Sequence, residues 1–237
     1  MLKKLTRFFW GIVLVPLAFS TLYHLPGACF PLFSQARSLL LILGGVLLYG
    51  LFEVLFSRPM RTYVFGHELT HALASLAIGG SVFSFRVSKR GGSVALSKTN
   101  FFVALAPYCI PIYTLFVLVI YFLLKTFYPI PHLQAAALSA VGASFAFHIS
   151  LTLFAIRQEQ PDILKTGTFF SLVFILLLNG WILILVSKVL FWNLISLKSF
   201  VLDTMKTQVL IWQWIWERSL DLFQWAHARW FQPAPAP

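Results

Sequence analysis

Long apolar runs constrain this chain more than any other feature. Hydrophobic residues make up 59% of its 237 residues and charged residues 11%, and the mean hydropathy is +0.84. A helix needs about 20 apolar residues to cross a hydrocarbon core of roughly 30 Å. Six apolar segments cover residues 8–25, 39–56, 63–78, 101–127, 132–156 and 168–190. We therefore expect an all-α polytopic protein with about six transmembrane or re-entrant helices, integral to a cell or inner membrane.

The basic residues indicate contact with a lipid bilayer and no nucleic-acid partner. The formal net charge is +11, but Lys and Arg lie at the N-terminus and between the apolar segments, where loops face anionic headgroups. Lys3, Lys4 and Arg7 precede the first segment as in a secretory signal. No convincing small-residue cleavage site follows, so we expect an uncleaved first span. Two cysteines, Cys29 and Cys109, do not indicate a disulfide framework.

Two stretches interrupt the helical pattern. Apolar and polar residues alternate over residues 81–97, around Arg90-Gly91-Gly92. Alternation about a Gly-Gly turn predicts a small β-hairpin directly after the third segment, with an ordinary surface loop as the alternative. The polar stretch 157–167 contains Pro161 as a helix stopper, and we expect a connecting loop there.

The C-terminal region is rich in tryptophan. Residues 202–231 contain five of the eight tryptophans: Trp212, Trp214, Trp216, Trp225 and Trp230. Tryptophan favours the headgroup zone because its ring is apolar and carries one N–H donor. We expect an interfacial helix here rather than another span, followed by an extended Pro-Ala tail.

The third apolar segment contains the motif His67-Glu68-Leu69-Thr70-His71. Residues four apart lie on one side of a helix, so both imidazoles can reach one Zn²⁺. Glu68 is displaced around the helix and can act as the general base for a zinc-activated water. Chance gives this pattern in roughly 0.3% of chains of this composition. The alternative interpretation is that both histidines hydrogen-bond to neighbouring helices and that Glu68 stays neutral.

A catalytic zinc requires a third protein ligand. We rank Asp162 first because it directly follows a proline in a loop at the end of a span. If the fourth and fifth segments form an antiparallel pair, that loop returns to the hairpin side. Glu159 ranks second and His148 third, although His148 is better explained as a hydrogen-bonded interior histidine. The remaining candidates are His24, His132 and Glu53.

With these residues, the chain resembles the site-2 protease family of intramembrane zinc metalloproteases. The resemblance covers residues 63–167 and rests on GHELTHALASLAIGG (66–80), the hairpin after it and the later Pro-Asp. It implies His67, His71 and Asp162 as metal ligands and Glu68 as the catalytic base. It also implies peptide-bond hydrolysis in or beside the membrane, with the hairpin pairing to a membrane protein or peptide substrate.

The resemblance divides the chain into N-terminal transmembrane helices (1–62), a metalloprotease core (63–167), and a final span with the Trp-rich tail (168–237). Two other functions stay open: a membrane zinc-binding or transport protein, and a catalytically inactive scaffold of the same fold. Orientation is also open. Basic residues flank the third segment on both sides, so they share one face of the membrane only if that segment enters and returns.

Overall fold

A computed structural model of the protein describes residues 2–88, 91–158 and 160–231. The fold is mostly helical with one small hairpin, as expected. Its elements are α1 (Leu2–Cys29), the 3-10 helix η1 (Phe30–Gln35), α2 (Ala36–Leu55), α3 (Met60–Ala77), β1 (Val82–Ser88), β2 (Gly91–Leu96), α4 (Phe101–Cys109), α5 (Ile112–Phe127), α6 (Leu133–Arg157), α7 (Pro161–Thr166), α8 (Thr168–Leu190) and α9 (Leu197–Phe231).

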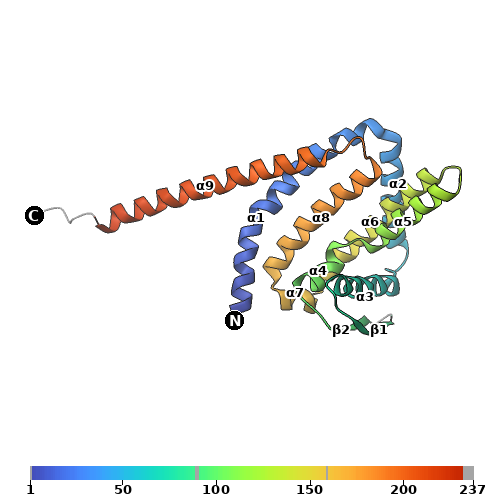
Figure 1. Ribbon diagram of the computed structural model, residues 1–237, viewed down its shortest axis with the longest axis horizontal. Coiled ribbons are helices and arrows are strands. Elements are labelled where there is room, and N and C mark those ends of the chain that lie inside the picture. Colours follow the sequence, from blue (N-terminus) through green and yellow to red (C-terminus); the bar gives the residue numbers. More distant parts are fainter. Residues whose placement is uncertain (1, 89–90, 159, 232–237) are drawn as a thin grey trace, which may run out of the picture.

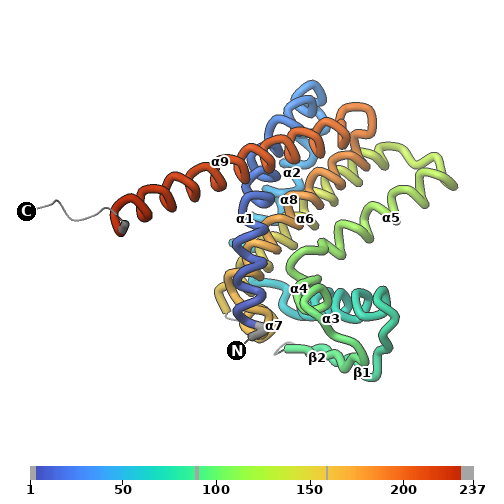
Figure 2. The backbone as a smooth tube through the Cα atoms, turned by 60° about the vertical axis from the view of Figure 1, so that its left-hand side comes forward, coloured from blue at the N-terminus to red at the C-terminus, as the bar shows by residue number. Residues whose placement is uncertain are grey.

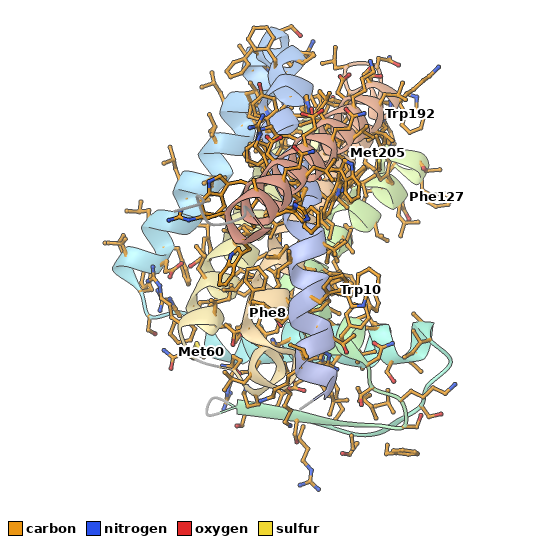
Figure 3. All side chains as sticks on the ribbon, turned by 90° about the vertical axis from the view of Figure 1, so that its left-hand side faces the viewer. Phe8, Trp10, Met60, Phe127, Trp192 and Met205 are labelled. Carbon is orange, nitrogen blue, oxygen red and sulfur yellow. The ribbon has the colours of Figure 1, made fainter. Side chains whose placement is uncertain are left out.

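Among the described residues, three helical stretches are long and apolar enough to cross a membrane. They are Lys4–Leu55, Leu133–Arg157 and Thr168–Leu190. The first includes α1, η1 and α2, and the chain changes direction at η1 (Figure 1). Large side chains such as Phe8, Trp10 and Phe127 are exposed on the outside of the bundle (Figure 3). Exposed apolar surface of this extent suits a lipid environment.

The expected single segment 101–127 is two helices rather than one. α4 and α5 meet at a bend of 66°, and they make a fourth candidate span if they are taken together. Pro111 caps α5 at the break. A proline lacks the backbone N–H that a continuous helix needs, and its ring disfavours a helical conformation in Ile110 before it. Because both halves are apolar, the composition of residues 101–127 does not reveal this break.

Two helix pairs build the bundle: α1 packs along α8, and α2 packs along α6 (Figure 2). The second pair approaches closely at two glycines. A Cβ on Gly45 would lie 1.9 Å from the Ser139 carbonyl oxygen, and a Cβ on Gly142 would lie 2.0 Å from the Ile42 carbonyl oxygen. Small residues let helix backbones approach in this way inside a membrane.

Helix α3 is not one of the candidate spans. It runs across one end of the bundle, beside the hairpin, in both views (Figures 1 and 2). The N-terminal end of α1, α4 and α7 gather at the same end. The basic residues on either side of α3 therefore share one end of the molecule, as they would if the segment entered the membrane and returned.

The predicted hairpin is present, but the glycine pair does not form its turn. β1 and β2 pair antiparallel, with Gly91 opposite Ser88 and Gly92 opposite Val87. Both glycines therefore lie in β2. Ser81 also binds Ser97, where its backbone N–H donates to the hydroxyl oxygen at 2.7 Å.

The stretch 157–167 also differs from the expected loop, because it contains the short helix α7. Pro161 starts α7 rather than stopping a helix. Proline is favoured at the first helical position, where its missing N–H would have no partner in any case. Gly167, at φ +99°, then turns the chain into α8. Asp162 consequently lies in the first turn of a helix.

Helix α9 begins at Leu197, five residues before the expected tail helix, and extends away from the bundle (Figure 1). Its first half packs against α1, and Thr204 is fully buried there. Its five tryptophans are all exposed, Trp230 most of all at 82%.

Candidate metal centre

Helix α3 presents His67 and His71 side by side. The residues lie four apart in one helix, which puts them on the same face. Their Nε2 atoms are 3.2 Å apart, and their rings meet edge to face with centroids separated by 4.8 Å. Two ring nitrogens thus point at one region of space.

Asp162 brings a third donor to the same region from α7. Its Oδ2 lies 3.6 Å from His67 Nε2 and 3.4 Å from His71 Nε2. Contacts of α7 with α4 and α8 hold it there. Among the described residues, these three form the group of histidine, cysteine and acidic side chains that could hold a metal ion.

The spacing of the three donor atoms fits a small metal ion. A triangle with sides of 3.2, 3.4 and 3.6 Å has its three corners about 2.0 Å from a common centre. Zinc binds histidine nitrogen and carboxylate oxygen at roughly 2.0–2.2 Å. The three donor atoms are therefore spaced as zinc would require, with His67, His71 and Asp162 as the residues that would hold it.

His71 is held in one orientation by a bond on the far side of its ring. Its Nδ1 donates to the backbone carbonyl of Val103 at 2.8 Å. This bond leaves the Nε2 lone pair directed at the donor group, in the arrangement typical of metal-bound histidines. His67 has no such bond in the described structure, because its Nδ1 is buried without a partner. Its ring instead packs against Tyr63 and Tyr108.

Asp162 is the electrostatic partner of both histidines. Burial tends to raise the pKa of its carboxyl group, but hydrogen-bonding contacts with His67 and His71 outweigh burial and hold that pKa well below its ordinary value. The hydroxyl of Tyr108 donates to Asp162 Oδ2 at 3.4 Å. The carboxylate is therefore kept charged and oriented.

Glu68 lies beside the donor group without joining it. Its side chain is 9% exposed and lines a cavity of about 640 Å³ together with His67, His71 and Asp162. Burial raises the pKa of Glu68, against the opposing influence of both histidines. A buried carboxyl group with a raised pKa beside a metal site has the properties of a general base.

The hairpin forms one wall of this cavity and touches Glu68 directly. A Cβ on Gly92 would lie 2.7 Å from Glu68 Cγ and 2.6 Å from Val64 Cγ1. Only a glycine lets β2 pass this close to α3. Sequence reasoning saw the glycine pair as a turn signal and missed this contact, which depends on how two elements pack.

Among the described residues, the other candidate ligands do not join this group. His148 bonds to Asn179 with its Nε2 3.2 Å from Oδ1, and Glu53 binds Arg58 and Ser150. His24 bonds to Thr207, and His132 precedes α6. Glu159 lies outside the described residues.

Sequence reasoning also missed two residues that support the donor group, Val103 and Tyr108. Both belong to α4, which packs against α3 and α7. Val103 acts through its backbone carbonyl, so no side-chain signal marks it. Tyr108 directly follows Ala106-Pro107 in an apolar helix, and a buried phenol in such a helix normally needs a partner. The need of the Tyr108 hydroxyl for a hydrogen-bond partner is the sequence signal that could have identified this residue.

Comparison of the chain with protein-family models, with curated proteins and with solved structures finds no match.

Proposed function

We propose that this chain is a zinc metalloprotease that hydrolyses peptide bonds of membrane-associated substrates. The proposal rests on the convergence of His67, His71 and Asp162. These residues are separated by up to 95 positions in sequence, yet their donor atoms lie 3.2–3.6 Å from one another. Glu68, buried in the same cavity, supplies the base that hydrolysis needs.

Zinc suits this donor set and would supply two effects when bound: a lower pKa for a coordinated water and polarisation of a carbonyl group. Glu68 accepts a proton from the attacking water at a carboxylate oxygen. The water oxygen bonds to the peptide carbon, the carbon–nitrogen bond breaks, and Glu68 returns the proton to the leaving amine. His71 is oriented for its part by Val103, and Asp162 by Tyr108.

The hairpin supports a peptide as the substrate. Four residues of β2 line the cavity: Gly92, Ser93, Val94 and Leu96. β1 occupies one edge of β2, and within the described ranges no strand pairs with the other edge. An extended substrate can bond to such an edge, which would keep the scissile carbonyl out of a helix.

The proposed setting is a multi-pass protein whose metal centre lies at one end of the bundle. The bent pair α4–α5 adds a span, and α1 and α2 make two separate crossings joined by η1. The outer half of α9 places its tryptophans in the headgroup layer and lies along the membrane surface.

Metal analysis paired with a cleavage assay tests the function. We expect about one zinc per purified chain, and cleavage of a model transmembrane peptide that stops when zinc is chelated and resumes when it is restored. Glu68→Gln should keep the zinc and lose at least about 10²-fold in rate. His67→Ala should lose both.

The same measurements separate the rival functions. Bound zinc without cleavage of any transmembrane peptide indicates an inactive scaffold. Zinc movement into vesicles that contain the protein indicates a transporter. Two histidines and a carboxylate also suit iron(II), so stoichiometric iron in place of zinc would contradict the proposal. Full activity in the Glu68→Gln protein would refute the base assignment.

A further inference from the structure

Two basic residues line the metal cavity in addition to the metal-binding group. Arg7 comes from α1 and Lys165 from α7, and both face the cavity of about 640 Å³ that holds Glu68 and the donor group. Helix α1 reaches this place because its N-terminal end lies beside α7 (Figure 1). Arg7 lies outside the segment that carries the family resemblance, so the resemblance assigns it no role.

Arg7 makes one hydrogen bond to α7, and its other donors have no partner among the described residues. One terminal nitrogen donates to the backbone carbonyl of Lys165 at 2.7 Å. A guanidinium group has five N–H donors, and this is its one described hydrogen bond. The bond joins the two basic residues, so they form a single feature of the cavity wall.

Neither cation has an acidic partner in the described part of the chain. The ion pairs there involve other residues: Glu53 with Arg58, Asp162 with the histidines, Asp203 with Lys206, and Asp221 with Arg218. Among the described residues that line the cavity, the acids are Glu68 and Asp162, whose two negative charges would balance one divalent ion. Arg7 and Lys165 then give the described lining of the cavity two positive charges in excess.

We propose that Arg7 and Lys165 form a subsite for a carboxylate group of the peptide substrate. The carboxylate is either an acidic side chain near the scissile bond or a free C-terminus. A guanidinium group binds a carboxylate through two parallel hydrogen bonds, and the ammonium group of lysine adds a second charge. The cavity volume falls in the range of roughly 300–1,000 Å³ that is usual for ligand sites.

This inference deepens the proposed function and rests on it for the nature of the ligand. It makes the protein selective for charged peptides. A neutral peptide would occupy the edge of β2 but would leave the half-buried Arg7 and the exposed Lys165 without an anionic partner. Such selectivity distinguishes substrates that share an apolar sequence but differ in charge beside it.

Binding to the full-length Glu68→Gln protein, loaded with zinc in detergent, tests the subsite without requiring turnover. The probes are fluorescein-labelled peptides of one length that share an apolar sequence. One pair differs by Glu or Gln beside the central bond, and a second pair by a free or amidated C-terminus. Fluorescence anisotropy should show at least tenfold tighter binding for the acidic member of one pair. If that is the Glu/Gln pair, the carboxylate is a side chain; if it is the second pair, the carboxylate is the free C-terminus.

The preference should fall to about twofold or less when both Arg7→Gln and Lys165→Gln are introduced. Lys165→Gln alone should reduce it partly while leaving the bond from Arg7 intact, so this variant tests the subsite even if the Arg7 change destabilises α1. Arg86→Gln is the matched control, because Arg86 is exposed on β1 and does not line the cavity. It should keep the full preference.

Equal affinity for both members of both pairs overturns the subsite, as does a preference that survives in the double variant or an absence of peptide binding. The proposed function fails separately. Acidic peptides that bind selectively but are never cleaved by the unaltered protein would refute the protease and leave the subsite. Cleavage of acidic and neutral peptides with equal efficiency would support the protease and refute the subsite.

Discussion

At the scale of the residue, the donor group depends on side chains that do not touch the metal position. Tyr108 donates to the Asp162 oxygen that faces both histidines. We expect Tyr108→Phe to weaken zinc binding by about 10-fold, since loss of such supporting bonds typically costs 10–100-fold. Asp162→Ala should weaken it much more. Competition with a fluorescent zinc chelator measures both effects, and Tyr128→Phe, an exposed site, serves as the control.

Gly92 sets the position of Glu68. We expect Gly92→Ala to push the Glu68 side chain away, because the added methyl group would lie 2.7 Å from its Cγ. A displacement near 1 Å commonly costs about 10²-fold in rate. Zinc content should stay unchanged, since neither histidine is touched. Gly50→Ala has open space around it and should leave cleavage unaffected. If the Gly92→Ala protein cleaves peptides as fast as the unaltered protein, Glu68 is free to move aside.

What the sequence reveals at this scale follows from helix geometry. A spacing of four predicts adjacent imidazoles, and the two Nε2 atoms do lie 3.2 Å apart. Their role as zinc ligands stays a prediction. Asp162 was ranked first from its place between spans, but its approach to α3 depends on α4, α7 and α8 packing together. Gly92 and Val103 carry no sequence signal of their own, because their importance comes from contacts with another element.

At the scale of the element, α2 and α6 form a closely packed helix pair in the bundle. We expect Gly45→Ala and Gly142→Ala each to destabilise the bundle by roughly 1–3 kcal/mol, because each methyl group would meet a backbone carbonyl rather than a flexible side chain. Gly44→Ala is the matched control, with nothing within 4 Å. It should be neutral or stabilising. Thermal unfolding followed by circular dichroism compares the three. Equal midpoints for Gly44→Ala and Gly45→Ala would contradict the close contact.

Apolar composition predicts where helices are but not where they break. Residues 101–127 form one apolar run, yet Pro111 divides them into α4 and α5 at 66°. That bend keeps α4 at the end of the bundle, where it supplies Val103 and Tyr108. Pro161, by contrast, begins a helix where a helix end was expected. Proline occurs at both ends of helices, and the sequence alone does not distinguish the two cases. The hairpin was predictable because alternation has a period of two that helices do not share.

At the scale of the whole molecule, charge indicates which way the protein faces. Arg58 lies between α2 and α3, Arg61 lies in the first turn of α3, and Arg86 lies in β1. Lys98 precedes α4, and Lys165 lies near the end of α7. The elements that carry them gather at the metal-centre end (Figure 1). Because positively charged loops stay in the cytoplasm, we expect that end to face the cytoplasm.

Cysteine labelling tests this orientation at the two ends of α2. In a Cys29→Ala background, Ser34→Cys in η1 should react with a membrane-impermeant maleimide on intact cells. Ser57→Cys, which follows α2, should react only after the membrane is permeabilised. Cys109 stays in place because it is 1% exposed. The reverse pattern would place the metal centre on the outer side.

The sequence left orientation open because a segment of 16 residues can either cross or turn back. The structure offers a third arrangement, in which α3 lies across the end of the bundle. This position depends on how α3 packs against the hairpin and α4, which no count of apolar residues conveys. Overall helical content and the presence of long apolar spans were predictable, since they reflect composition alone.

The distribution of tryptophan determines what spectroscopy of this protein will report. Five of the eight indole rings belong to α9, and their emission colour will mainly follow attachment of that helix to detergent or lipid. No tryptophan lines the metal cavity as described. An unfolding curve recorded by intrinsic fluorescence would thus track the release of α9, and it would not report the loss of the group formed by His67, His71 and Asp162.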